Sequence, residues 1–231
     1  MMIDLSTRSD EDEWMDAPGV APDELVRTLD DLARLNARIG GHLPSIAGLE
    51  ELGVNREKLT VLDVGTGDGD IPRRFADWAR RREIELDVTG IELSAISAEH
   101  ARRRCMTYPE IRVQQRDLFE MQEQRFDVVH ASLMLHHLMG ERAEEGLRRM
   151  VELSRLGVII NDLHRHPISY WGSFALLRLL SDNPMIHHDG TVSIARGFRR
   201  RELGELADRS GASNWTIRWW PLFRWQVVLE V

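Results

Sequence analysis

From about residue 58 onward, short apolar runs alternate with longer segments in which apolar residues recur three and four positions apart. The short runs are typical of buried strands, and the longer segments are typical of amphipathic helices. Strands that alternate with helices imply βαβ units, so we expect a doubly wound α/β fold with a parallel sheet. The expected strands cover 60–64, 86–91, 111–115, 126–131 and 157–161, and the expected helices cover 71–82, 95–105, 141–154, 172–182 and 199–210.

The C-terminal segment follows a different pattern. Two strand-like runs, 215–220 and 225–230, are separated only by residues 221–224, which begin with Pro221. A connection this short joins antiparallel strands, because parallel strands need a longer crossover. The expected fold is therefore a seven-stranded, mostly parallel sheet with a C-terminal antiparallel hairpin.

Two segments lie outside the alternation of strands and helices. Residues 1–21 are acidic and irregular, which predicts an arm that is partly ordered at best without a ligand. Helices are expected at 23–39 and 45–52, and the strongly apolar segment 163–200 is expected to form a helical lid. We expect a single structural domain, in which an arm and helical cap at 1–57 precede the main ligand-binding part at 58–231, with the lid at 163–200 inserted into it.

Composition and charge narrow the class of protein. The chain has 231 residues and a formal net charge of −8, which disfavours nucleic acid as a partner. The single cysteine, Cys105, fits a reducing compartment. Residues 1–14 lack the apolar stretch of a signal peptide, and the apolar segment 171–180 is too short for a bilayer. We therefore expect a cytoplasmic protein without a membrane span.

A glycine-rich turn directly follows the first expected strand. Residues 65–70 are Gly-Thr-Gly-Asp-Gly-Asp, and a helix is expected to follow. Glycines at such a turn let a ligand approach the backbone, and the helix N-terminus offers free N–H groups. A dinucleotide site would have a third glycine at position 70, where this chain has Asp70, so a pyrophosphate would meet the carboxylates of Asp68 and Asp70. A ligand that carries cationic as well as anionic groups suits this turn better.

Residues 62–69, Leu-Asp-Val-Gly-Thr-Gly-Asp-Gly, resemble the first motif of the class I methyltransferases that depend on S-adenosylmethionine (SAM). The resemblance covers about 58–162 and implies a Rossmann-like sheet whose last strand is reversed, with SAM as cofactor and S-adenosylhomocysteine as product. It also implies an acidic residue after the second strand for the ribose hydroxyls, and one after the third strand near the adenine amine. Glu92 and Asp117 stand at these two positions. The residues expected to bind the cofactor are Asp63, Gly65, Thr66, Gly67, Gly69, Glu92, Leu93, Asp117, Leu118 and His130.

Taken singly, these acidic residues have simpler interpretations. Glu92 is compatible with an exposed loop acid, Asp117 with a helix N-cap, and Asp63 with a structural acid that holds the turn. Signals at three successive strand ends favour the cofactor site, because ligands of open α/β sheets bind at the carboxyl ends of the strands.

Methyl transfer is an in-line displacement at a carbon that the sulfonium already activates, so the protein mainly aligns the acceptor and excludes water. A phenol or quinol acceptor must also lose a proton, and histidine suits this task near neutral pH. His164 and His166 follow the fifth expected strand, and His137 follows the fourth within Leu-His-His-Leu. We expect the catalytic group among these three.

The remaining histidines carry weaker hypotheses. His187, His188 and Asp189 are expected in a polar loop between Pro184 and Gly190. The histidines form no recognised metal-binding spacing, so no metal is expected.

The acceptor class rests on two features. Base-modifying amino-methyltransferases carry Asp or Asn, two prolines and an aromatic residue after the fourth strand, whereas this chain has His-Ala-Ser-Leu at 130–133. The apolar lid suits an aromatic or lipid-tailed acceptor, although packing against the sheet or a homodimer contact would explain it equally. A cluster of arginines either begins a solvated helix or meets a carboxylate or phosphate of the acceptor: Arg196, Arg199, Arg200 and Arg201.

The overall pattern is similar to the small-molecule, quinone-biosynthesis-like branch of the family. This similarity implies O- or C-methylation of a small hydrophobic acceptor of the phenol or quinol type. Two alternatives are a non-catalytic SAM-binding protein of the same fold and an NAD(P)-dependent oxidoreductase, and Asp70 counts against the second.

Overall fold

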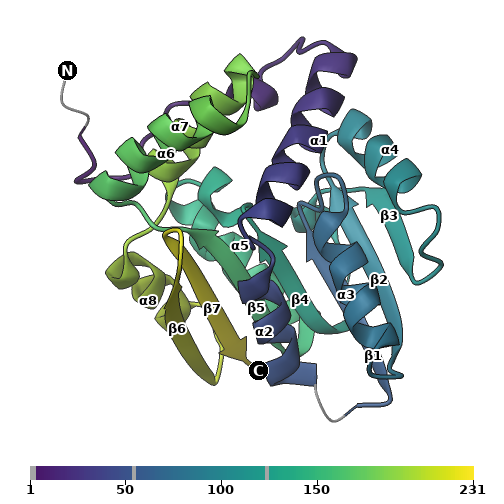
Figure 1. The fold of residues 1–231 in the computed structure, drawn as a ribbon. Helices are drawn as coiled ribbons and strands as arrows, with labels where there is room; N and C mark the ends of the chain where they lie inside the picture. Colours follow the sequence, from purple (N-terminus) through teal and green to yellow (C-terminus); the bar gives the residue numbers. More distant parts are fainter. Residues whose placement is uncertain (1–3, 54–55, 123–124) are drawn as a thin grey trace.

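A seven-stranded sheet forms the centre of the computed structural model (Figure 1), which describes residues 4–53, 56–122 and 125–231. The order of the strands across the sheet is β3-β2-β1-β4-β5-β7-β6. Strands β1 to β5 are parallel, and β7 pairs antiparallel with both β5 and β6, which confirms the predicted fold class. The bounds are β1 (Lys58–Val64), β2 (Glu85–Glu92), β3 (Ile111–Gln115), β4 (Phe126–Ser132), β5 (Ser154–Leu163), β6 (Asn214–Trp220) and β7 (Arg224–Glu230).

The topology places a ligand-binding crevice beside β1. From β1 the chain passes outward to β2 and β3, and it then returns to β4 on the other side of β1. The loops after β1 and β4 therefore lead in opposite directions and leave a space between them at the carboxyl ends of the strands.

Helices cover both faces of the sheet, because the buried strands are apolar on both sides. Successive residues of β1 alternate between the two cores: Val61 packs with Phe75 and Trp78 of α3, and Leu62 packs in the core that contains Met150 of α5. Figure 1 shows α2 and α3 in front of the sheet and α5 and α8 behind it. The helices around the sheet are α2 (Leu43–Gly53), α3 (Asp70–Arg80), α4 (Ala95–Arg104), α5 (Glu141–Leu153) and α8 (Arg200–Arg209).

Three further helices gather at the upper end of the sheet in Figure 1: α1 (Pro22–Arg38), α6 (Pro167–Leu180) and α7 (Pro184–Arg196). The polar loop expected around residues 187–189 is wrong, because these residues lie inside α7. Asn183 caps this helix by accepting a hydrogen bond from the Met185 N–H. Gly190 lies within this helix, and its missing side chain leaves room for Leu177 of α6, since a Cβ there would lie 2.2 Å from Leu177 Cδ1.

The N-terminal arm lies against the rest of the protein. Leu5 is buried, and Arg8 donates hydrogen bonds to the carbonyl oxygens of His136 and Arg196. A 3-10 turn, η1 (Trp14–Asp16), follows and contacts α7. The sequence predicts an arm that is partly ordered at best, whereas in the structure the arm packs against the rest of the protein. Residues 1–3 of the arm lie outside the described residues.

The apolar segment 163–200 packs only partly against the rest of the protein, and several of its apolar side chains are exposed. On α6, the side chains of Ile168, Trp171, Phe174 and Leu179 are exposed. None of the described helices is long and apolar enough to cross a membrane.

Candidate functional site

The glycine-rich turn forms the floor of the site. Three glycines in it adopt positive φ angles, Gly65 (69°), Gly67 (57°) and Gly69 (75°), which side-chain-bearing residues rarely adopt. The N–H groups of Gly65 and Thr66 both donate to the carbonyl oxygen of Ile91, which ties the turn to the end of β2. The backbone of the turn therefore faces the crevice without intervening side chains at the glycines.

A cavity of about 740 Å³ opens above this turn. Its walls come from the ends of β1 to β4, from α1 and from the arm, and its size falls within the usual range for small-molecule sites. Eight of the predicted cofactor residues line it: Asp63, Gly65, Thr66, Gly67, Glu92, Leu93, Asp117 and Leu118. Gly69 and His130 were also predicted to bind the cofactor, but neither residue lines the cavity.

Gly69 and His130 support the site from behind. Gly69 is the N-cap of α3, where a Cβ would lie 2.6 Å from Cys105 Sγ, so this glycine serves helix packing. The buried ring of His130 lies between Asp63 and Ser45, with its Nδ1 2.5 Å from Asp63 Oδ1 and its Nε2 2.9 Å from Ser45 Oγ. His130 thus orients the Asp63 carboxylate, which combines a structural contact with a place on the cavity wall.

Glu92 is held at the cavity by backbone groups. Its carboxylate accepts hydrogen bonds from the N–H groups of Gly67, at 3.0 Å, and Ser94, at 3.2 Å. Burial raises the pKa of Glu92, and these backbone donors partly oppose the rise. Asp117 also has two contacts: it caps η2 (Leu118–Glu120) by accepting from the Phe119 N–H, and it lines the cavity.

The turn carries a concentration of carboxylates. Asp68 pairs with Arg73 at 3.1 Å, whereas Asp70 has no ion pair with any of the described residues. Burial, followed by the charge of Asp68, raises the pKa of Asp70 to about 7. A site of this kind repels a pyrophosphate and attracts a cationic group, as argued from the sequence.

The residues at the turn suit the functional groups of SAM. The carboxylates of Asp63, Asp70 and Glu92 complement an ammonium, a sulfonium and two ribose hydroxyls. Thr66 also lines the cavity, and its buried hydroxyl, which lies against Gly90, has no hydrogen-bond partner among the described residues.

The roof of the cavity is apolar and comes from the N-terminal helix. Leu25, Leu29 and Leu32 follow one another at helical spacing on α1 and face the cavity, as does Val20 of the arm. From the segment 163–200, only Leu163 and Ser193 line the cavity. The roof therefore consists mainly of α1 and the arm, and the aromatic residues of α6 take no part in it.

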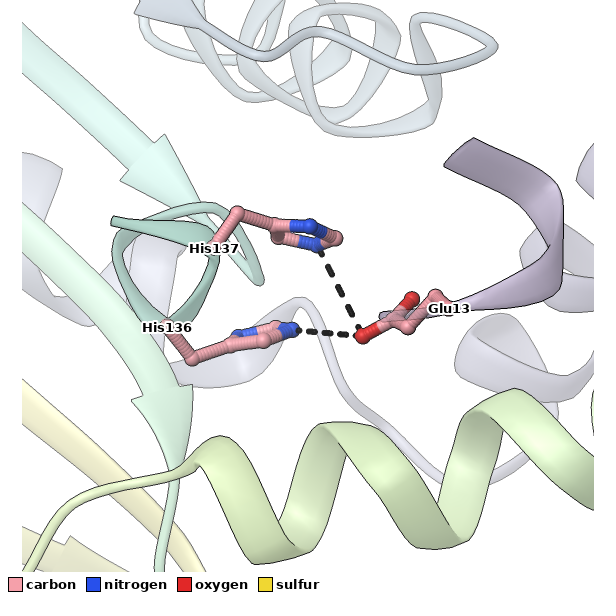
Figure 2. Close-up of side chains that lie close together, drawn as sticks. All are labelled: Glu13, His136 and His137. Atoms are coloured by element: carbon pink, nitrogen blue, oxygen red, sulfur yellow. Dashed lines mark ion pairs between the residues drawn. The ribbon is translucent and has the colours of Figure 1, made fainter. Parts of the chain in front are cut away.

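One of the three predicted catalytic histidines reaches the cavity. His137 lies in η3 (Leu135–His137), directly after β4, and its Nδ1 is 2.9 Å from Asp16 Oδ2. His136 also lines the cavity but is almost completely buried, and its Nδ1 is 2.7 Å from Asp162 Oδ1. Glu13 of the arm meets both rings, as Figure 2 shows.

His136 and Glu13 hold opposite charges in this buried group. Burial disfavours the imidazolium of His136, but the charges of Asp162 and Glu13 outweigh burial and raise the pKa of His136 to about 9. Burial likewise disfavours the Glu13 carboxylate, yet the adjacent histidines and Ser193 lower its pKa to about 2. Glu13 was not a candidate in the sequence, because nothing near it in the chain marks it.

His164 and His166 do not line the cavity. His164 packs against the ring of Trp225, with ring centroids 4.6 Å apart, and burial and nearby cationic groups lower its pKa to about 4. His166 caps α6, since its Nδ1 accepts a hydrogen bond from the Ile168 N–H. Their catalytic role stays a prediction, and the contacts described here are structural.

His188 and Asp189 serve the arm. The buried carboxylate of Asp189 accepts the N–H groups of Trp14 and Met15, at 2.8 and 3.0 Å. The ring of His188 stacks on Trp14, with centroids 4.0 Å apart. These two residues of α7 therefore hold the arm next to the cavity.

The predicted arginine cluster is divided between surface and interior. Arg200 and Arg201 are at the surface, whereas Arg196 is buried and donates to the carbonyl oxygens of His136 and His137. Arg196 thus holds in place the histidine turn, which is η3 (Leu135–His137). The cluster therefore does not form one continuous positive patch.

Comparison with known proteins agrees with this fold. Residues 61–157 match a family model described as a methyltransferase domain. No curated protein sequence matches the chain.

Several solved structures share the fold at low sequence identity. A SAM-dependent methyltransferase from Aquifex aeolicus matches with a TM-score of 0.64 and 16% identity over 91% of this chain and 98% of its own. An O-methyltransferase family protein from Burkholderia thailandensis gives 0.64 and 17% over 93% and 61%, and PigF with S-adenosylhomocysteine gives 0.66 and 20% over 96% and 63%. The chain thus spans less than two thirds of the last two.

The family match covers the strands and turns that surround the cavity floor, from β1 to the start of β5. The strand order, with β7 reversed between β5 and β6, extends over the rest of the chain. Residues 61–157 therefore match a methyltransferase domain, and the chain shares the fold of known SAM-dependent methyltransferases.

Proposed function

We propose that the protein transfers a methyl group from SAM to the oxygen or carbon of a small, hydrophobic acceptor of the phenol or quinol type. The observation that carries this proposal is the cavity, which joins an acidic, glycine-rich floor to a roof of leucine side chains. A polar cofactor and an apolar acceptor thus find matching surfaces within one enclosed space.

Within this proposal, the cofactor occupies the floor. Asp63 and Asp70 meet the methionine part with its positive charges, Glu92 accepts the ribose hydroxyls, and Asp117 with Leu118 borders the adenine. In this arrangement the floor would hold the cofactor, and the part of the cavity lined by the arm and α1 would remain for the acceptor.

The acceptor then lies between α1 and the histidine turn. Its ring contacts leucine side chains of α1, and its hydroxyl meets the polar group formed by His137, Asp16 and Glu13. With SAM bound, the proton of the acceptor hydroxyl would pass to the polar group of His137, Asp16 and Glu13, and the freed electron pair would form the bond to the methyl carbon. The carbon–sulfur electron pair would remain on the departing S-adenosylhomocysteine. The enclosed site aligns these atoms and excludes water.

The test is a methyl-transfer assay with a panel of phenols and quinols, on the native protein and on His137→Ala and His164→Ala. Loss of a group that acts on the proton typically costs about 10²–10⁴-fold in turnover, so His137→Ala should show a loss of this order with unchanged affinity for S-adenosylhomocysteine. His164→Ala should lose much less, because its ring is outside the cavity. An equal or larger loss in His164→Ala, or acceptance of no phenol or quinol while an amine is methylated, would contradict the proposal.

A further inference from the structure

We propose that Glu13, His136 and His137 bind a divalent transition-metal ion of the Zn²⁺ type at the acceptor end of the cavity. One ligand atom from each residue lies within 4.8 Å of the other two, and Figure 2 shows the two rings and the carboxylate converging. Two histidines and one carboxylate are a common ligand set for such ions where one coordination position stays open.

The distances between these side chains fit metal ligands better than hydrogen bonds. Glu13 Oε1 lies 3.4 Å from His136 Nε2 and 3.9 Å from His137 Nε2. A nitrogen–oxygen hydrogen bond is typically about 2.7–3.2 Å long. Two atoms that each lie about 2.1 Å from a tetrahedral ion are separated by about 3.4 Å.

The imidazole nitrogens are oriented for this role. In each ring Nδ1 faces a carboxylate, Asp162 for His136 and Asp16 for His137. Nδ1 therefore carries the proton when the ring is neutral, so an ion bound at Nε2 would displace the proton that the His136 imidazolium holds there. This pairing of carboxylate and imidazole orients most histidine ligands of metal ions.

His136 provides an independent indication. Its side chain is 2% exposed, and its Nε2 has no hydrogen-bond partner among the described residues. Buried polar atoms in folded proteins are usually hydrogen-bonded, whereas this nitrogen has only the 3.4 Å ion pair with Glu13, which is long enough for an ion to bridge the two atoms. Glu13 is likewise held in place, because Ser193 donates a hydrogen bond of 2.7 Å to its Oε1.

The site has an open side, because all three residues line the cavity. An ion there would hold a water molecule or the oxygen of an acceptor in its remaining position and would stabilise a phenolate. His137 would then act on the acceptor as a ligand of the ion. This part of the inference rests on the proposed function, whereas binding of the ion does not.

The sequence does not reveal this site, because its ligands come from distant parts of the chain. Glu13 is in the N-terminal arm, and Asp189 of α7 holds the adjacent turn in place through the N–H groups of Trp14 and Met15. A second group with similar spacing, Asp30, Asp68 and His100, lies among ion pairs with Arg73 and Arg104 and serves as a comparison site.

The test is a titration of the metal-free native chain with Co²⁺, followed by visible absorption and calorimetry, with Glu13→Gln as the key variant. We expect one equivalent to bind with the intense absorption of a four- or five-coordinate ion, and Glu13→Gln to bind at least about 100-fold more weakly, since even outer-shell changes cost about 10–100-fold. Glu11→Gln, a matched change two residues earlier on the arm, should bind as the native protein does. His137→Asn provides a second variant should Glu13→Gln fail to fold.

Three outcomes would overturn the proposal. These are no stoichiometric binding by the native protein, undiminished binding by both Glu13→Gln and His137→Asn, and binding that is lost in His100→Gln instead. Titration of the same metal-free samples with S-adenosylhomocysteine reports on the cofactor site alone, so failure of the metal proposal and failure of the proposed function give different results.

Discussion

Glu92 combines two tasks in one side chain. Its carboxylate holds the glycine-rich turn through the Gly67 N–H, and it lies on the cavity wall where the ribose of SAM is proposed to bind. A carboxylate that accepts hydrogen bonds from hydroxyl groups stabilises a complex more than a neutral acceptor does.

Replacing Glu92 by Ala should therefore weaken the binding of S-adenosylhomocysteine by about 1–3 kcal/mol, the usual cost of losing a hydrogen bond to a charged group. Calorimetric titration measures this loss. Glu99→Ala, which removes an exposed acid of α4, is the matched control and should bind as the native protein does. An unchanged dissociation constant for Glu92→Ala would remove Glu92 from the ribose site.

Asp70 makes the stability of the protein depend on pH. Its pKa is about 7 in the folded protein, because of burial and Asp68, against an ordinary value of 3.8. Between these two pH values the folded protein binds more protons at this group than the unfolded chain, so its contribution to stability falls as pH rises. Above about pH 7 the destabilising contribution is fully present.

The variant Asp70→Asn removes this contribution. At pH 8 its free energy of unfolding should exceed that of the native protein by ~2 kcal/mol, discounted from the full shift because the carboxyl lies at the cavity wall. The difference should vanish towards pH 4. Urea denaturation at a series of pH values measures it, and a difference that stayed constant with pH would contradict the assignment.

At the scale of elements, two glycines of the turn between β1 and α3 have different roles: Gly67 lines the cavity, and Gly69 allows close packing. Gly67 and Gly69 both adopt positive φ angles, but a Cβ at Gly67 would meet no atom within 4 Å, whereas at Gly69 it would lie 2.6 Å from Cys105 Sγ. Gly69 thus serves the packing of α3 against α4, and Gly67 serves the cavity.

The two alanine variants should accordingly differ. Each loses about 1 kcal/mol of stability from the left-handed backbone, and Gly69→Ala loses a further ~1–3 kcal/mol from the contact with Cys105. Gly67→Ala should lose less stability than Gly69→Ala, but it should weaken the binding of S-adenosylhomocysteine more. Urea denaturation and calorimetry on the same samples test this, and equal losses of stability would show that Cys105 does not constrain Gly69.

The elements around the floor and the roof helix α1, expected at 23–39 and found at Pro22–Arg38, were predictable from sequence, whereas α7 was less so. Local signals predict the strand at Lys58–Val64 and its glycine turn. These signals are a buried apolar run and the glycines that follow it, which adopt positive φ angles. Helix α7 carries Gly190 and a polar His-His-Asp sequence, and it forms because it packs against α6. Tertiary packing overrides local propensity in such cases.

The candidate site divides along the same line. Glu92 and Asp117 stand directly after predicted strands, so topology alone brings them to one edge of the sheet. Glu13 and His136 meet only because the arm folds back over the sheet, which no local pattern encodes. His164 and His166 also follow a strand, but α6 begins immediately after them and takes the Nδ1 of His166 as its cap.

At the scale of the whole molecule, the arm and α1 cover part of the crevice at the end of the sheet, so that it becomes a partly enclosed cavity. The backbone of the arm is fixed by Asp189 at Trp14 and Met15, and the side chain of Arg8 bonds to the His136 carbonyl. The same segments supply the apolar roof and Glu13. The proposed cofactor site at the floor and the proposed acceptor site under the roof are therefore formed by different parts of the chain.

The measurement that tests the central claim most directly is calorimetric titration of the protein with S-adenosylhomocysteine, with NAD and NADP as comparison ligands. The acidic turn and the Glu92 carboxylate predict micromolar binding of S-adenosylhomocysteine and no binding of either nicotinamide nucleotide. Binding of a nicotinamide nucleotide instead, or of none of the three, would contradict the assignment of residues 65–69 as a SAM site and with it the proposed function.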